Sequence, residues 1–370
     1  MVIYKRLEEV CDILDSQRIP ITASERTKGV YPYYGANGIQ DYVDDYIFDD
    51  ELVLLAEDGG NFGSTEKPIA YRVSGKCWVN NHAHVLKAKD IIDTDYLCLA
   101  LMFYNTDGLV NGATRQKLNQ KAMRSMIIPV RSSEDQQRIK LIIQKVFSLI
   151  ESHKKQIDKL DELIKSRFVE MFGDIGTNSK GWLLSPLEEV AEIRIGPFGS
   201  LLHKEDYVCN CHALVNPSHI VDGKIKTDEK LTINNEKYQE MSAYHLQKDD
   251  IVLGRRGEMG RCAVVEQEGL LCGTGSMIIR PNGKIKPFFL QTILSSPLYK
   301  RILEDKAVGV TMLNLNVPIV SSITIPLLPI ELQDRFIELL QSVEKQKATV
   351  QQSIDKLEAL KKSLMQEYFG

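Results

Sequence analysis

Apolar residues recur at alternating spacings of four and three along a long stretch in the middle of the chain. Such a narrow row is the heptad seam of a helix that packs against one other helix, and it differs from the broad apolar face of a surface helix. Residues 134–172 contain neither Gly nor Pro, so the pattern predicts one continuous helix of roughly 58 Å. The row consists of Ile139, Ile143, Val146, Ile150, Ile157, Leu160, Ile164 and Phe168.

The same row returns in residues 330–370. Pro129 and Pro326, which precede the two stretches, are 197 positions apart (326 − 129), and Gly173 and Gly370, which end them, have the same separation (370 − 173). One constant offset over the whole stretch indicates a duplicated unit. The second row consists of Phe336, Leu340, Val343, Val350, Ile354, Leu357 and Met365.

A long helix with a narrow apolar seam needs a partner. The other copy in the same chain supplies one, so we expect two long antiparallel coiled-coil helices. The alternatives are that each helix packs on its own globular block or pairs with a second chain. His153 and Lys347 lie in the seams, where a polar residue commonly fixes the register of the two helices, and we assign them this role.

A globular block precedes each helix. The blocks open with the similar sequences Leu7-Glu-Glu-Val and Leu187-Glu-Glu-Val, so the duplication includes the domain starts. Short strand-like runs alternate with turns, which predicts an α+β fold with two mostly antiparallel β-rich domains and a pseudo-twofold internal duplication. The expected strands are 47–48, 50–55, 69–73, 78–86, 250–254, 261–266 and 271–280, and the expected helices are 95–104 and 287–303. The expected domains are 1–130 and 174–328, with the spacer helices in 131–173 and 329–370.

Composition narrows the class of protein. The chain has 370 residues, of which 43% are hydrophobic and 26% charged, with a net charge of -4. A protein that holds nucleic acid unaided usually has a basic surface, so a DNA-binding role here requires local basic patches or a more basic partner. No signal peptide and no membrane-length apolar run is present, so we expect a cytoplasmic protein without a membrane partner.

Signatures of metal binding and catalysis are missing. Seven scattered cysteines suggest reduced thiols, and Cys209 to His212 lacks the second ligand pair of a zinc site. We also assign His82 and His84 a structural role. The chain contains no phosphate-binding loop, and Gly273-Thr-Gly-Ser lacks the third glycine of a dinucleotide fingerprint. We therefore expect no catalytic residues, no cofactor and no metal.

Four loops carry candidate binding chemistry. Residues 31–38 and 57–63 combine glycines with tyrosine, asparagine and acidic side chains, and residues 196–202 form a further Gly-rich loop. Residues 254–260 place two arginines on a glycine hairpin, which suits bidentate contact with guanine or phosphate. Taken singly, each of these loops is equally compatible with an ordinary hairpin and core aromatics.

Together, these features resemble the specificity (S) subunits of type I restriction-modification systems over essentially the full chain. The resemblance rests on the order of recognition domain, helix, recognition domain and helix, which is more specific than any one motif. The matching segments are Tyr33–Ile39, Ala56–Gly59, Asn81–Leu86, Leu253–Gly257, Gly275–Met277, Glu134–Arg138 and Glu331–Arg335.

The resemblance implies a non-catalytic subunit that binds double-stranded DNA, with each domain reading one half of a bipartite target. The helices would set the gap and dock two modification (methyltransferase) subunits, and restriction (endonuclease/translocase) subunits would join for cleavage. The rival interpretation is a coiled-coil adaptor or scaffold that does not bind DNA. The implied DNA-binding residues are Tyr33, Tyr34, Asn37, Asp58, Asn61, Arg115, Lys117, Phe198, Ser200, Arg255, Arg256 and Asn314.

Overall fold

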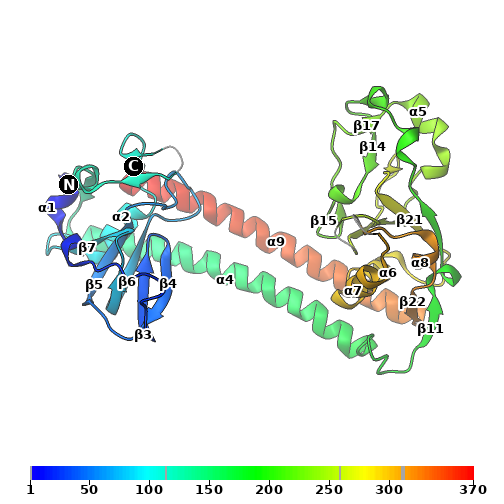
Figure 1. Ribbon diagram of the computed structural model, residues 1–370, viewed down its shortest axis with the longest axis horizontal. Coiled ribbons are helices and arrows are strands. Elements are labelled where there is room, and N and C mark those ends of the chain that lie inside the picture. The colour runs from blue at the N-terminus through cyan, green and yellow to red at the C-terminus, as the bar shows by residue number, and fades with distance from the viewer. Residues whose placement is uncertain (1, 113–114, 258–259, 310–312) are drawn as a thin grey trace. The chain divides into compact units, whose positions relative to one another are not determined.

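The computed structural model describes residues 2–112, 115–257, 260–309 and 313–370. Two compact units make up the chain: unit 1 is Met1–Ile157 with Thr349–Gly370, and unit 2 is Asp158–Ala348. The predicted long helices are confirmed as α4 (Ser133–Phe172) and α9 (Ile330–Phe369), and each unit contains a segment of both (Figure 1). None of the helices in the described ranges is long and apolar enough to cross a membrane.

The centre of unit 1 is a six-stranded sheet of order β2-β7-β5-β6-β3-β4, in which only the β3–β6 pair is parallel. Successive side chains of a strand point to opposite faces. In the central strand β5, Val53 and Leu55 therefore enter one core, while Leu52 and Leu54 enter another. The strands are β2 (Cys11–Ile13), β3 (Lys28–Gly35), β4 (Gly38–Val43), β5 (Phe48–Ala56), β6 (Ala70–Val79) and β7 (Ala83–Ala88).

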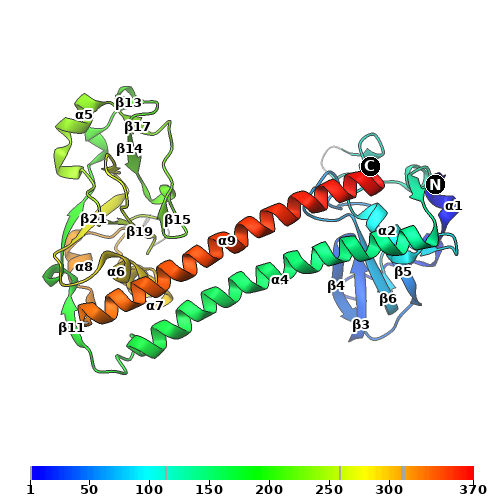
Figure 2. The same cartoon turned by 180° about the vertical axis from the view of Figure 1, so that it is seen from behind.

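Helix α2 of unit 1 lies between this sheet and the long helices, as Figure 2 shows from behind. Asp93 caps α2 by accepting the backbone N–H of Tyr96 at 3.0 Å, and the Tyr96 ring packs edge-on against Phe369 of α9. Ile139 and Ile143 of α4 complete this core. The remaining elements are β1 (Ile3–Arg6) paired with β10 (Ile127–Val130), β8 (Val110–Asn111) paired with β9 (Lys117–Leu118), α1 (Leu7–Val10), η1 (Asp15–Gln17), α2 (Thr94–Met102) and α3 (Gln120–Arg124).

Unit 2 contains a four-stranded antiparallel sheet of order β12-β21-β18-β19. This order corresponds to β2-β7-β5-β6 of unit 1. A second sheet, β13-β17-β14-β20, has its own small core. The strands are β11 (Leu183–Pro186), β12 (Ala191–Ile195), β13 (Tyr207–Val208), β14 (His212–Val215), β15 (Ile220–Val221), β16 (Lys224–Ile225), β17 (Thr232–Ile233), β18 (Ile251–Gly254), β19 (Cys262–Val264), β20 (Leu271–Cys272), β21 (Ser276–Pro281) and β22 (Thr324–Leu327).

Four phenylalanines join the long helices to the body of unit 2. The Phe172 ring of α4 lies 5.0 Å from Phe289 of α6 and 5.2 Å from Phe336 of α9, with Phe168 beside them. These edge-on contacts fix both helix segments on one core. The helices are α5 (Asn235–Glu240), α6 (Pro287–Leu294), α7 (Pro297–Lys306), α8 (Val317–Ser321), η2 (Leu187–Glu189), η3 (Gly199–Leu201), η4 (Lys204–Asp206), η5 (Pro217–His219) and η6 (Ser242–Tyr244).

A repeated glutamine makes the same contact in both units. Gln136 of α4 accepts the backbone N–H of Asp93, just before α2, at 2.7 Å. Gln333 of α9 accepts the backbone N–H of Lys286, just before α6, at 2.8 Å. The duplication seen in the sequence is therefore also a duplication of contacts. Near the start of each long helix, a glutamine accepts a hydrogen bond from the residue before α2 in unit 1 or α6 in unit 2.

Within each unit the two long-helix segments run antiparallel. In unit 1, Arg131, just before α4, donates to the carbonyl of Tyr368 near the end of α9 at 3.1 Å, and Lys154 pairs with Glu358 at 3.8 Å. The contact partner in α9 therefore moves toward lower residue numbers as α4 proceeds. The same direction holds in unit 2, where Phe172 at the end of α4 meets Phe336 near the start of α9.

The two polar residues predicted in the seams have local partners. The Lys347 ammonium lies 2.8 Å from a carboxylate oxygen of Asp161 on the other helix. The Nδ1 of His153 lies 2.7 Å from the carbonyl oxygen of Leu149, one turn earlier. Neither side chain faces a cluster of metal-ligand type among the described residues.

Some predicted elements have different boundaries. The strand expected over 78–86 is wrong, because β6 ends at Val79 and β7 begins at Ala83. Between them, the side-chain oxygen of Asn80 accepts the N–H of His82 at 2.8 Å, which makes a turn. The helix expected over 287–303 is two helices, since Pro297 starts a new one.

Two further segments also divide at turns. Residues 271–280 hold both β20 and β21, which are separated by Gly273 to Gly275. The expected loop over 31–38 is mostly strand, because Tyr31 to Gly35 belong to β3 and Gly38 begins β4. Only residues 36–37 form the hairpin turn, and Gly38 adopts a φ of 109°, which favours glycine.

Candidate nucleic-acid interface

The ends of β5 in unit 1 and β18 in unit 2 hold predicted residues at equivalent places. Asp58, two residues beyond β5, forms an isolated antiparallel bridge with Lys117. Arg256, two residues beyond β18, forms the same bridge with Asn314. The predicted residues Asp58, Lys117, Arg256 and Asn314 are thus brought together in two matching pairs, one in each unit.

The residue before each bridge is also equivalent. The carbonyl of Glu57 accepts the N–H of Leu118 at 2.7 Å, and the carbonyl of Arg255 accepts the N–H of Leu315 at 3.0 Å. One backbone frame therefore presents two carboxylates in unit 1 and two guanidinium groups in unit 2. The side chains at these two equivalent positions are therefore acidic in unit 1 and basic in unit 2.

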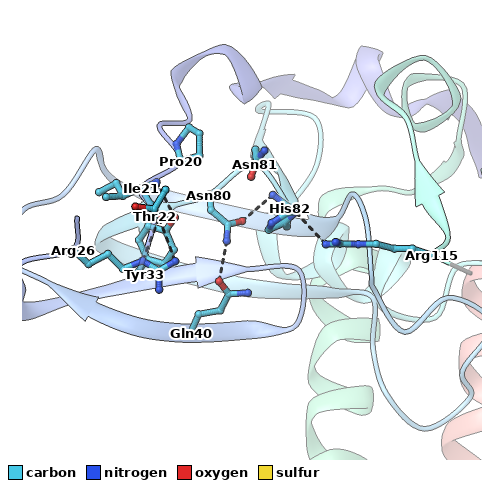
Figure 3. A pocket seen from close by; sticks show the side chains of 10 residues that line it. All are labelled: Pro20, Ile21, Thr22, Arg26, Tyr33, Gln40, Asn80, Asn81, His82 and Arg115. Atoms are coloured by element: carbon cyan, nitrogen blue, oxygen red, sulfur yellow. Dashed lines mark hydrogen bonds between the residues drawn. The ribbon is translucent and has the colours of Figure 1, made fainter. Parts of the chain in front are cut away.

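In unit 1, Asp58 holds the side chains of His82 and Arg115. Its Oδ1 atom lies 2.7 Å from His82 Nδ1 and 2.7 Å from Arg115 Nη2, and Figure 3 shows the Arg115 side chain reaching toward His82. The Arg115 side chain is 61% exposed. Since a guanidinium has five N–H donors, most of them remain available to a phosphate or to a guanine edge.

A charged network ties this region to the sheet. Glu57 lies 2.7 Å from Arg18 Nη1 and 3.0 Å from Lys117 Nζ. Asp15 lies 2.7 Å from Nδ1 of His84, whose side chain is fully buried. Because Lys117 takes part in this network, its ammonium is already paired and also anchors the segment that carries Arg115.

The same network contains the grouping that most resembles a metal site. Ligand-type atoms of Asp15, Glu57 and His84 lie within 4.8 Å of one another. Arg18 and Lys117 already engage Glu57, and both ring nitrogens of His84 face oxygen atoms, namely those of Asp15 and of a backbone carbonyl. The atoms that could bind a metal are therefore already engaged, and the cluster is a network of hydrogen bonds and ion pairs.

Electrostatics support this assignment. Burial opposes ionisation of Asp15, but the hydrogen bond and charge of His84 outweigh it, and the pKa of Asp15 is lowered. Burial likewise opposes ionisation of Glu57, yet hydrogen bonds from Arg18 and Lys117 lower its pKa. Both carboxyl groups are therefore ionised at neutral pH and cannot serve as proton donors.

A pocket of about 480 Å³ opens beside Asp58 and Arg115 (Figure 3). Tyr33 forms part of its wall: the residue is 1% exposed, its hydroxyl donates to the carbonyl of Ile21 at 3.2 Å, and Arg26 lies 4.1 Å from its ring centroid. Tyr33 therefore acts as a buried support of the pocket. The lining residues are Pro20, Ile21, Thr22, Arg26, Tyr33, Gln40, Asn80, Asn81, His82 and Arg115.

Three more predicted residues of unit 1 lie on the β3–β4 hairpin or in the loop after β5. The Tyr34 ring is tilted against Tyr71, with centroids 5.7 Å apart. Asn37 is exposed at the hairpin turn and donates to the carbonyl of Gly59 at 3.0 Å. Asn61 donates to the carbonyl of Pro68 at 3.4 Å. Of the three, Asn37 connects the hairpin to the loop that carries Asp58.

In unit 2 the two adjacent arginines have different environments. Arg255 is 4% exposed, and its guanidinium donates to the carbonyl of Thr274 at 3.2 Å and to Asn314 Oδ1 at 3.3 Å. Arg256 is exposed. Within the described residues, neither guanidinium has a carboxylate partner. Burial and the neighbouring charge of Arg256 lower the pKa of Arg255.

The remaining predicted residues of unit 2 lie after β12. Phe198 is 62% exposed, which is unusual for a large aromatic side chain, and precedes η3. The backbone of Ser200 belongs to η3. No hydrogen bond or ring contact links the Phe198 side chain to the arginine pair among the described residues, so these two candidate regions of unit 2 remain separate.

The family model of the type I restriction modification DNA specificity domain matches residues 2–162 and 179–359. The two matched segments together include most of the chain and one copy of the duplicated unit each. The chain belongs to this family.

Individual relatives agree with the family match. A putative type I restriction enzyme specificity subunit of Haemophilus influenzae is 39% identical over 127 residues, which span 34% of this chain and 32% of that relative. The crystal structure of the type I S subunit from M. genitalium aligns with 100% of this chain over 96% of its own length, with a TM-score of 0.61 and 14% identity. A second solved structure comes from a study of complex assembly and conformational transition of the type I system. Its alignment has a TM-score of 0.62 and 16% identity, and it covers 100% of this chain and 97% of that chain. These structures share the fold.

Membership confirms the predicted family and the α+β fold class, and it agrees with the expectation that this specificity subunit is not itself an enzyme. Of the ten residues that line the pocket, the sequence alone predicted only Tyr33 and Arg115 as binding residues, and Arg26, Gln40, Asn80 and Asn81 are among those that it missed. The segment Asn80 to His84 was assigned a structural role on the basis of its two histidines, and no binding role was predicted for its asparagines. Its two amides between strand-like segments were the available signal, because asparagine favours turns and also hydrogen-bonds bases.

Proposed function

We propose that this specificity subunit binds double-stranded DNA and that its two globular domains, residues 1–130 and 174–328, each read one half of a bipartite target. The observation that carries the proposal is the charge reversal on a shared frame, with Glu57 and Asp58 in one unit and Arg255 and Arg256 in the other. Because the two units have the same backbone arrangement at this position but side chains of opposite charge, they are suited to half-sites of different sequence.

The proposed contacts follow from exposure and unused hydrogen-bonding capacity. Arg115 and Arg256 are exposed guanidinium groups suited to guanine or phosphate, and Phe198 is an exposed aromatic suited to apolar contact. Arg255 acts indirectly, because it holds Asn314 and adds positive potential from a buried position. Tyr33, Tyr34, Asn37, Asn61 and Lys117 would shape the surface, and Ser200 completes the predicted set.

We further propose that the paired helices, in residues 131–173 and 329–370, set the gap between the half-sites. They would also dock two methyltransferase subunits, which restriction subunits join in the cytoplasm for cleavage. A net charge of -4 supports such a division of labour, since partners would supply much of the phosphate contact. The chemistry of methyl transfer and cleavage would then reside in those partners.

The test is to reconstitute the chain with a methyltransferase partner and to identify the target by sequencing methylated DNA. Binding to duplexes carrying the target is then measured for the wild type, Arg115→Ala and Arg256→Ala at several salt concentrations. We expect each variant to lose roughly 5- to 150-fold in affinity, which corresponds to about 1–3 kcal/mol, and to relax selection in one half-site only.

Lys248→Ala, an exposed lysine in the loop before β18, is the control for loss of a positive charge away from the candidate residues and from the long helices. Loss of selection in both half-sites by either single variant would contradict the assignment of one unit to one half-site. Absence of sequence-selective, salt-dependent binding by the complex would instead favour the adaptor interpretation.

A further inference from the structure

We infer that the pocket of unit 1 reads an adenine of the first half-site through the side-chain amide of Gln40, an inference that rests on the proposed function. Gln40 lies on β4 and lines the pocket, and its side chain faces Asn80 across the floor (Figure 3). Among the described residues, the pocket is lined by the guanidinium groups of Arg26 and Arg115 and by no carboxylate. The lining therefore suits a polar ligand that carries negative charge nearby.

The orientation of the Gln40 amide is fixed by a chain of hydrogen bonds. Asn80, which is only 3% exposed, donates its amide N–H to Gln40 Oε1 at 2.9 Å and accepts the backbone N–H of His82 at 2.8 Å. His82 is in turn held by Asp58. Because Oε1 of Gln40 faces Asn80, its Nε2 amino group is directed elsewhere, and it has no partner among the described residues.

A glycine creates the space that Gln40 occupies. A Cβ atom at Gly35 would lie 2.2 Å from Gln40 Nε2 and 2.4 Å from its Cδ. The backbone of Gly35 does not have a positive φ, so its lack of a side chain serves the neighbouring glutamine. The position of the amide therefore depends on both Gly35 and Asn80.

An adenine edge matches the groups that remain free. Adenine offers the N7 acceptor and the N6 donor side by side in the major groove, and a glutamine amide pairs with both at once. Gln40 Nε2 can donate to N7, while the second lone pair of Oε1 can accept from N6. Arg115 at the rim would contact the edge of a guanine in the same half-site. Asn81, whose amide has no partner in the described part of the chain, lies on the opposite side of the pocket and remains available for a neighbouring base.

The test uses the reconstituted complex and its target DNA, with the half-site of unit 1 identified as the one altered by Arg115→Ala. Each adenine of that half-site is replaced in turn by 7-deazaadenine, which lacks N7 but keeps pairing. We expect one replacement to weaken wild-type binding at least fivefold, as for loss of a base contact of about 1 kcal/mol. Gln40→Ala should lower the affinity for natural DNA by a similar factor. The 7-deazaadenine replacement should not lower the affinity of this variant any further.

Gly35→Ala should reproduce the Gln40→Ala behaviour, because the added methyl group displaces the amide. Gln17→Ala, an exposed glutamine of η1 outside the pocket, is the matched control and should bind as the wild type does. Circular dichroism and thermal melting of each variant separate loss of reading from loss of folding.

The inference is overturned if Gln40→Ala and the wild type respond equally to every 7-deazaadenine, or if the half-site of unit 1 contains no A·T pair. In either case selective binding by the complex would leave the proposed function intact. If the wild-type complex does not select any DNA sequence, the proposed function itself fails, and the inference fails with it.

Discussion

Arg255 provides a test of whether a buried charge serves folding or binding. Its guanidinium is 4% exposed, makes two hydrogen bonds to neutral oxygens, and has no carboxylate partner among the described residues. Arg18 of unit 1 is also largely buried but pairs with Glu57 at 2.7 Å and Asp15 at 3.6 Å. The same substitution, Arg to Met, should therefore have different effects in the two units.

The magnitudes follow from the charges that each substitution leaves behind. Burial of an unpaired cation costs several kcal/mol, while each hydrogen bond from a charged donor returns about 1.5–3 kcal/mol. These contributions nearly cancel for Arg255, so Arg255→Met should change the free energy of unfolding by less than about 2 kcal/mol. Arg18→Met removes a cation from two buried carboxylates, and we expect a loss of about 3–5 kcal/mol.

Urea unfolding measures both effects. Trp182 reports unit 2 in a Trp78→Phe background, and Trp78 reports unit 1 in a Trp182→Phe background. In the reconstituted complex, Arg255→Met should also reduce affinity for target DNA about tenfold or more, as for loss of about 1.4 kcal/mol. A destabilisation of unit 2 by 3 kcal/mol or more, with unchanged DNA affinity, would refute the reasoning.

Two further predictions concern acid stability and spacing. The pKa values of Asp15 and Glu57 lie below the ordinary 3.8 and 4.5, so the stability they contribute is complete above about pH 4.5 and is lost as the pH falls through their folded values. Between pH 5 and 3, Asp15→Asn should therefore lose less unfolding free energy than the wild type, and equal losses would contradict this. Inserting one heptad after Gln156 in α4 and one after Ser353 in α9 lengthens each helix by about 10 Å. Methylated-DNA sequencing should then show a gap longer by about three base pairs between unchanged half-sites, and an unchanged gap would count against a spacing role.

The long helices were predictable from sequence because a heptad seam repeats over many turns and its ends are marked by proline and glycine. The short β elements were harder to place. Residues 78–86 contain apolar and β-branched residues at both ends, as one long strand or two short strands would. The adjacent asparagines favour a turn, but the hydrogen bond from the His82 backbone N–H to Asn80 that places the turn there is visible only in the structure.

The candidate site shows a second limit of sequence reasoning. Arg255 and Arg256 are adjacent and chemically identical, yet one is buried and the other exposed. The sequence analysis gave both the same DNA-binding role, although successive side chains along an extended backbone point to opposite faces. Which of the two faces solvent depends on what packs behind the strand, here Thr274 and Asn314, and these residues are distant in sequence.

Comparison of the two units suggests how one fold can accommodate different targets. The four strands β2-β7-β5-β6 and β12-β21-β18-β19 have the same order, and each set packs under the helix that Gln136 or Gln333 holds. The segments inserted between these strands differ completely. In unit 1 the insertion is the β3–β4 hairpin, which extends the sheet and carries Gln40, whereas in unit 2 it is a separate sheet with its own core. Because the conserved contacts lie at the helix side and the insertions lie elsewhere in each unit, an insertion can change without loss of the contacts that hold the long helices. The same division explains why charge can reverse between Asp58 and Arg256 while the backbone bridges at both positions persist.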